Sequence, residues 1–168
     1  MAVDAYVCRP PGSPNQARRG GNDPVNDELD MRRGSGQGLE SDCRTRVGVM
    51  VVDDHAVFRR AARAVIHATA GFEPVGDAAS GVEALRAADE LRPDLVLMDV
   101  HMPGMDGLEA ARRLTEARPN CVVVLVSLDM LDDAAAVATA CGAVDFVLKR
   151  ELRPATLRGL WSTHGRRG

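Results

Sequence analysis

Side chains that could do chemistry follow apolar runs at four points of this sequence. They are the acid pair Asp53-Asp54, then Asp99, Ser127 and Lys149. If the fold brings them together, the carboxylates repel, since two charges ~4 Å apart cost about 4 kcal/mol at an effective dielectric constant near ~20. Lys149 supplies only one positive charge. Such a pocket needs a proton or a bound cation, and Mg²⁺ suits carboxylate oxygens.

Asp99 is the candidate nucleophile of this set, because a carboxylate can accept a phosphoryl group to form an aspartyl-phosphate. Ser127 and Lys149 would then donate to the other phosphoryl oxygens. Lys149 is the only lysine among 21 Lys and Arg residues. A compact ammonium is not equivalent to a planar guanidinium, so the lysine favours a functional role over a chance surface position.

The apolar runs before these residues predict strands buried on both faces of a parallel sheet. Four such runs lie at residues 47–52, 95–98, 121–126 and 145–148. A weaker, edge-like strand is expected at 74–78. Helical patterns begin after Asp54, after Ser80 and near Gly107, and two more span about 132–140 and 154–164. This alternation predicts an α/β fold with a doubly wound five-stranded parallel sheet, (βα)5.

The flavodoxin-like strand order 2-1-3-4-5 is one common order for such a sheet, and ligands bind at the carboxyl ends of its strands. In that order the strands ending on Asp53-Asp54, Asp99, Ser127 and Lys149 are neighbours. We therefore expect these side chains to share one pocket. By contrast, His55 follows the acid pair and could cap a helix or reach the site, of which capping or solvent exposure is the favoured expectation.

Composition limits the rest of the chain. Residues 1–45 are rich in Pro and Gly with mixed charges and no apolar period, which predicts a disordered tail before a domain at 46–163 and a flexible end at 164–168. A net charge of −3 disfavours direct nucleic-acid binding. No apolar run approaches the ~20 residues of a membrane span, and no secretory signal is visible. Four cysteines without CxxC spacing are typical of reduced thiols, which indicates a cytoplasmic protein.

Jointly, these motifs resemble the receiver domain of bacterial two-component response regulators, from Val47 to about Trp161. The motifs are Asp53-Asp54, the run 99–107, Ser127, Phe146 and Lys149. The segment 53–59 (DDHAVFR) is similar to the NarL/FixJ-like group.

The resemblance implies roles for these residues. Asp99 would accept a phosphoryl group from a sensor histidine kinase or a histidine phosphotransfer protein. Mg²⁺ would be held by Asp53, Asp54, Asp99 and the backbone carbonyl of His101. Ser127 and Phe146 would form the switch pair, and Lys149 would pair with the phosphate. Leu128 is larger than the residue that more often follows this serine in the family, which predicts restricted access to the phosphate.

We expect a stand-alone receiver that signals to a downstream protein partner, with a homodimer allowed, and no catalysis beyond its own phosphorylation and dephosphorylation. One alternative is the receiver part of a LuxR-type DNA-binding transcription regulator whose output domain is missing from this chain. Another is a pseudo-receiver that binds partners unphosphorylated, against which the complete acid, Ser and Lys set argues. A third is a Mg²⁺-dependent phosphatase of another α/β class, but such enzymes commonly carry Asp-x-Asp after their first strand, unlike Asp53-Asp54-His55.

Overall fold

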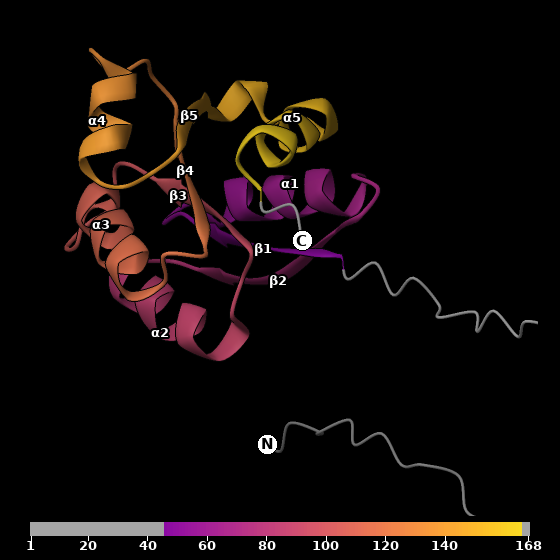
Figure 1. Cartoon of the computed structure of the whole chain (residues 1–168), viewed down its shortest axis with the longest axis horizontal. Coiled ribbons are helices and arrows are strands. Elements are labelled where there is room, and N and C mark those ends of the chain that lie inside the picture. Colours follow the sequence, from indigo (N-terminus) through magenta and orange to yellow (C-terminus); the bar gives the residue numbers. More distant parts are fainter. Residues whose placement is uncertain (1–45, 166–168) are drawn as a thin grey trace, which may run out of the picture. The chain divides into compact units, whose positions relative to one another are not determined.

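The computed structural model describes residues 46–165, and in them five strands alternate with five α-helices (Figure 1). Their bounds, in chain order, are β1 Val47–Val52, α1 Ala56–His67, β2 Phe72–Ala78, α2 Gly81–Leu91, β3 Leu95–Asp99, α3 Gly107–Ala117, β4 Val122–Ser127, α4 Ala134–Ala140, β5 Asp145–Leu148, the 3-10 turn η1 Lys149–Glu151 and α5 Pro154–His164. The predicted tail at 1–45 and the last residues, 166–168, lie outside the described part. None of the helices in 46–165 is long and apolar enough to cross a membrane.

The strands form one parallel sheet in the order β2-β1-β3-β4-β5, which confirms the predicted topology. The strand register places the functional residues at the same edge of the sheet. Asp99 pairs with Val126, the residue before Ser127. Ser127 in turn pairs with Leu148, the residue before Lys149. Asp99, Ser127 and Lys149 therefore step across three neighbouring strands at their carboxyl ends.

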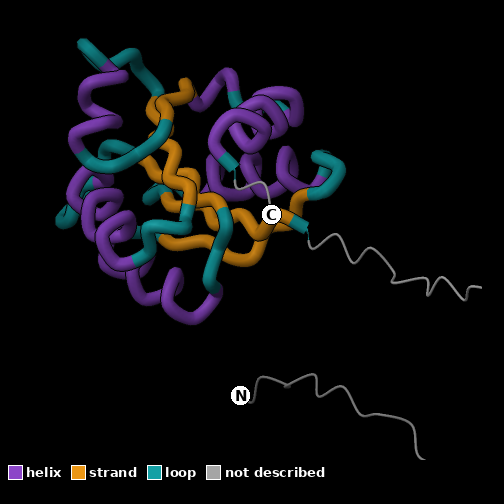
Figure 2. Tube along the Cα trace, in the orientation of Figure 1, coloured by secondary structure: helices purple, strands orange, loops and turns teal. Residues whose placement is uncertain are grey.

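Alternate side chains of the central strands enter two separate cores, so the sheet lies between two layers of helices (Figure 2). On one face Met50, Val96 and Val123 pack with α2, α3 and α4. On the other face Val51 and Leu97 pack with α1 and α5. Burial on both faces explains why these strands are apolar throughout rather than alternating.

Two elements differ from the sequence-based expectation. Strand β2 begins at Phe72 rather than at Pro74, and Pro74 is tolerated because β2 is an edge strand whose register with β1 shifts between Val49 and Met50. Helix α4 begins at Ala134 rather than near 132. Its N-cap residue Asp133 has a positive φ of 52° and makes no side-chain capping bond. Seven residues, mostly alanine, give this helix little apolar surface to bury.

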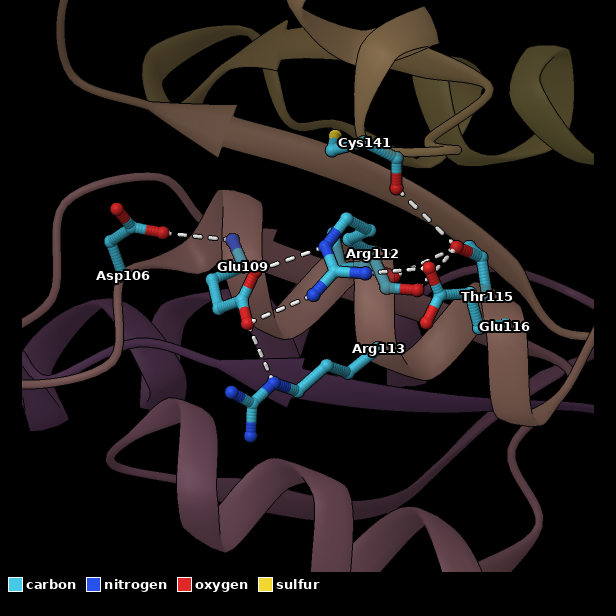
Figure 3. Close-up of polar contacts among 8 residues, drawn as sticks. Asp106, Glu109, Arg112, Arg113, Thr115, Glu116 and Cys141 are labelled. Atoms are coloured by element: carbon cyan, nitrogen blue, oxygen red, sulfur yellow. Dashed lines mark hydrogen bonds and ion pairs between the residues drawn. The ribbon is translucent and has the colours of Figure 1, made fainter.

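The loop from Asp99 to Gly107 ends in a well-capped helix. The Asp106 carboxylate accepts a hydrogen bond from the Glu109 backbone N–H at 2.8 Å. Figure 3 shows how Glu109 then receives hydrogen bonds from Arg112 and Arg113, which lower the pKa of its carboxyl to about 2. Farther along α3, Thr115 Oγ1 donates to the Cys141 carbonyl oxygen at 3.3 Å, joining α3 to the end of α4.

Candidate functional site

A small cavity of about 100 Å³ lies at the carboxyl ends of β3, β4 and β5. It is lined by His55, Asp99, His101, Ser127, Leu128, Asp129 and Lys149. Asp99 and Ser127 are almost wholly buried beside it, and Asp53 at the end of β1 is fully buried. Strand topology thus brings together the four chemistry-bearing positions that the sequence suggested.

Lys149 stands at the centre of the cluster. Its Nζ lies 2.6 Å from Asp53 Oδ2 and 3.1 Å from Asp99 Oδ1. The ammonium also lies 4.9 Å from the centroid of the Phe58 ring, where a cation–π attraction adds to the ion pairs. Helical spacing places Phe58 on the inner face of α1, and nothing in the sequence pattern indicates its contact with Lys149.

The surroundings of Asp99 shift the pKa of its carboxyl in opposite directions. Burial raises the pKa of its carboxyl above the ordinary value of 3.8, while the hydrogen bond from Lys149 lowers it and the negative charge of Asp53 raises it again. A hydrogen bond from the His101 backbone is a further lowering influence. Lys149 therefore offsets part, but not all, of the cost of burying this carboxylate.

Three carboxylates and one imidazole at this edge could share a metal ion. The candidate ligand atoms of Asp53, Asp54, His55 and Asp99 lie within 4.8 Å of one another. Asp53 Oδ2 and Asp54 Oδ1 are buried oxygens, and their close polar neighbours are the Lys149 ammonium at 2.6 Å and the His55 ring at 2.7 Å. One ammonium against three acids leaves net negative charge, so the donor set fits a divalent cation with oxygen ligands.

His55 lies at this site rather than acting as the expected cap. It occupies the N-cap position of α1 but makes no side-chain capping bond. Its Nδ1 lies 2.7 Å from Asp54 Oδ1 and 3.5 Å from Asp53 Oδ1. The expectation of solvent exposure is met, since the side chain is 68% exposed, yet the ring still reaches the acids.

Arg59 braces the acid pair from behind, a role that the sequence did not suggest. Its Nη1 donates to the Asp53 carbonyl oxygen at 2.6 Å, and its Nε donates to Asp77 Oδ2 at 2.8 Å. Arg63 bonds the other Asp77 oxygen at 2.9 Å. The loop that presents Asp53 is thereby tied to both α1 and β2. The separation of 18 residues between Arg59 and Asp77 leaves no local pattern from which to predict the contact.

The two expected switch residues lie on neighbouring strands but face different surroundings. Ser127 Oγ accepts a 3.4 Å hydrogen bond from the Asp129 backbone N–H, inside the cavity wall. Phe146 is half-buried, pairs with Leu125 and lines a separate hollow beside α4. Leu128 is 64% exposed and lines the cavity, where it can limit access.

Comparison with known proteins gives a consistent result. Residues 49–159 match the family model described as "Response regulator receiver domain". The transcriptional regulatory protein LiaR of Bacillus subtilis is 33% identical over 103 residues, which are 61% of this chain and 49% of LiaR. Protein-glutamate methylesterase/protein-glutamine glutaminase 2 of Photobacterium profundum is 37% identical over 105 residues, 62% of this chain and 27% of that protein. The chain thus spans less than half the length of these curated relatives.

Solved structures agree on the fold. The response regulator domain of Thermotoga maritima CheB has 29% identity and a TM-score of 0.65, covering 73% of this chain and 99% of the other. A LuxR-family two-component response regulator from Aurantimonas sp. SI85-9A1 has 31% identity and a TM-score of 0.64, covering 73% and 88%. The signal receiver domain of the putative response regulator NarL from Mycobacterium tuberculosis has 31% identity and a TM-score of 0.61, covering 68% and 96%.

Proposed function

This chain belongs to the response regulator receiver domain family, and from that premise we propose that Asp99 is its phosphoacceptor. The donor would be a sensor histidine kinase or a histidine phosphotransfer protein in the cytoplasm. The observation that carries the proposal is the position of Asp99 at the end of β3, buried between Asp53 and Ser127 and ion-paired with Lys149. A carboxylate so placed has a fixed donor ready for the incoming phosphoryl oxygens.

The transfer needs only positioning and charge neutralisation from this chain. An oxygen of the Asp99 carboxylate attacks phosphorus, and the bond between phosphorus and the donor's histidine nitrogen breaks. That nitrogen keeps the electron pair and takes up a proton. Lys149 and the Ser127 hydroxyl would donate to two of the phosphoryl oxygens, where negative charge gathers.

We assign the acid pair to a Mg²⁺ ion. Asp53, Asp54 and Asp99, with the backbone carbonyl of His101, would hold it, as the buried oxygens of Asp53 and Asp54 support. The ion would neutralise phosphoryl charge during transfer. Lys149 would hold the Asp99 carboxylate in place, while Arg59 holds the backbone carbonyl of Asp53.

Signalling would follow from a change between two conformations rather than from turnover of an external substrate. Ser127 would move toward the phosphate, and Phe146 would read that movement by packing alone, because its ring has no hydroxyl. Its position in a hollow beside α4 supports this, because α4 has only seven residues and its N-cap residue Asp133 makes no side-chain capping bond. The output would be a downstream protein, and a homodimer of receivers is compatible with it.

The test is phosphorylation by a small phosphodonor in the presence of Mg²⁺. Intact-mass spectrometry should show one added phosphoryl group on the full chain and none on Asp99→Asn. Asp106→Asn is the matched control, because asparagine caps a helix as well as aspartate and should leave labelling unchanged. Equal labelling of Asp99→Asn and the wild type would reject the assignment, and no labelling of any form would support the pseudo-receiver alternative.

A second candidate is the receiver portion of a LuxR-type transcription regulator. It is favoured by the DNA-binding response regulator relatives and by the partial span of the curated proteins. A helix-turn-helix reading frame in the adjoining genomic sequence would support it. DNA binding would then depend on that additional domain, and the same chemistry at Asp99 would control it.

A further inference from the structure

His55 is placed to do more than border the acidic site. It lines the cavity, and its side chain is 68% exposed. Its ring nevertheless contacts the carboxylates of Asp53 and Asp54. The Nδ1 atom lies 2.7 Å from Asp54 Oδ1 and 3.5 Å from Asp53 Oδ1. Its own backbone N–H donates to Asp53 Oδ1 at 2.8 Å, which fixes the residue against the fully buried acid.

These separations suit ligands of one ion. Two ligand atoms at right angles, each about 2.1 Å from an octahedral ion, lie about 3 Å apart. The two distances from the His55 nitrogen bracket that value, and all four candidate ligand atoms lie within 4.8 Å of one another. A nitrogen thus completes a set that is otherwise all oxygen.

We propose that His55 is a direct ligand of the ion bound at this site and makes it a site for borderline divalent transition metals, such as Co²⁺, as well as Mg²⁺. The inference rests on the metal site of the proposed function and adds the imidazole to it. Imidazole suits transition metals, whereas Mg²⁺ prefers carboxylate, carbonyl and water oxygens. His55 therefore raises affinity for one class of ion and barely affects the other.

A simple hydrogen bond between His55 and Asp54 would explain the same distances. His55 Nδ1 at 2.7 Å from Asp54 can simply be hydrogen-bonded to that carboxylate. In that case its loss would affect Mg²⁺ and Co²⁺ to the same small extent. The two accounts differ in selectivity between metals and in whether a nitrogen touches the ion, and both can be measured.

The experiment uses the full chain and three variants, His55→Ala, His55→Phe and His67→Ala. His55→Phe keeps a planar ring without nitrogens. His67 is an exposed imidazole at the far end of the same helix, roughly 18 Å away along its axis, and is the matched control. Calorimetric titration gives Mg²⁺ and Co²⁺ affinities, counting only Co²⁺ that Mg²⁺ can displace. Pulsed electron paramagnetic resonance of bound Mn²⁺ reports a coordinated nitrogen.

Both His55 variants should lose roughly tenfold or more in Co²⁺ affinity while keeping their Mg²⁺ affinity within about twofold, and the nitrogen coupling to Mn²⁺ should vanish. His67→Ala should match the wild type in every respect. An unchanged Co²⁺-to-Mg²⁺ ratio, or Mn²⁺ without nitrogen coupling in the wild type, would overturn the role of His55 while leaving the Mg²⁺ site intact. If the wild type binds no divalent cation, the metal site fails, and the proposal for His55 fails with it.

Discussion

Lys149 lies nearer to Asp53 than to Asp99, at 2.6 Å from Asp53 Oδ2 against 3.1 Å from Asp99 Oδ1. The sequence predicted a single ammonium in an acidic pocket, which would later pair with a phosphate. In the structure this ammonium is paired with both acids, and its side chain is only 5% exposed. Lys149 is thus a structural counter-ion of two buried acids. If Asp99 is phosphorylated as proposed, we expect the ammonium to shift from Asp53 toward the new charge.

Removing Lys149 should therefore destabilise the unmodified protein. In Lys149→Ala, Asp53 and Asp99 keep their burial and lose their counter-ion, and breaking a buried pair in this way typically costs about 3–5 kcal/mol. Urea denaturation of the metal-free protein measures the change in free energy of unfolding. A loss smaller than about 1 kcal/mol, as found for surface ion pairs, would contradict the structural role.

The companion variant is Lys149→Ala with Asp53→Asn. It removes the fully buried charge as well as its partner, so it should recover part of the lost stability. Arg150→Ala is the control, because this neighbouring cation is exposed. It should change the free energy of unfolding by less than about 0.5 kcal/mol.

Because of Asp99, the stability of the protein should fall as pH rises, which is opposite in sign to the effect of an acid whose pKa is lowered by folding. Burial raises the pKa of its carboxyl above 3.8, so the folded state holds the proton more tightly than the unfolded state. The associated stability is present below pH 3.8 and is lost as pH rises through the folded-state value. Asp99→Asn cannot ionise, so its stability relative to the wild type should grow with pH.

Denaturation midpoints of wild type and Asp99→Asn between about pH 4 and 8, with a chelator present, test this linkage. The advantage of the variant should widen over that range and then level off. A gap that stays constant with pH would mean that burial does not control the titration of Asp99.

The central strands could be predicted because they are apolar on both faces, so 47–52 and 95–98 stand out from the amphipathic helices. The chemistry-bearing residues could be predicted because parallel strands end at one edge. The Arg59 brace and the Phe58 ring beneath Lys149 could not, since both contacts arise from tertiary packing of α1. For His55 the expected solvent exposure is met, but its side chain makes no capping bond, and its Nδ1 lies 2.7 Å from Asp54 Oδ1.

Mg²⁺ should stabilise the fold if the acid pair binds it. Binding to the folded state alone adds RT ln(1 + [L]/Kd), which is ~2.7 kcal/mol at about 100 times Kd. A thermal melt with and without Mg²⁺, at matched ionic strength, should show the shift in wild type. It should be greatly reduced in Asp54→Asn, which loses a candidate ligand, and retained in Asp106→Asn. A melting temperature indifferent to Mg²⁺ would count against the metal site.

The proposed tail supplies a separate prediction. We propose that residues 1–44 are dispensable for the domain, because β1 begins at Val47 and both described core clusters are built from Val47 onward. A chain starting at residue 45 should keep its melting temperature and its phosphorylation. A large loss of helical signal on truncation would show that the segment contributes to the fold.

Gly107 gives the sharpest test of how the Asp99 loop is built. It is the first residue of α3, its backbone N–H donates to the Val100 carbonyl at 3.0 Å, and a Cβ added there would overlap the Asp99 carbonyl oxygen. Backbone cannot swing aside as a long side chain can, so Gly107→Ala must displace the loop or the helix. Overpacking of this kind costs about 1–3 kcal/mol, and phosphorylation of Asp99 should slow as well.

Gly159→Ala is the matched control for that substitution. It makes the same change inside α5, where an added Cβ meets nothing within 4 Å. There, alanine should stabilise the protein by about 0.5–1 kcal/mol, because it lowers the backbone entropy lost on folding. Opposite signs for the two variants in urea denaturation would establish that the chain approaches Asp99 too closely for any side chain at 107. A Gly107→Ala variant as stable and as rapidly phosphorylated as the wild type would show that the loop has room to spare.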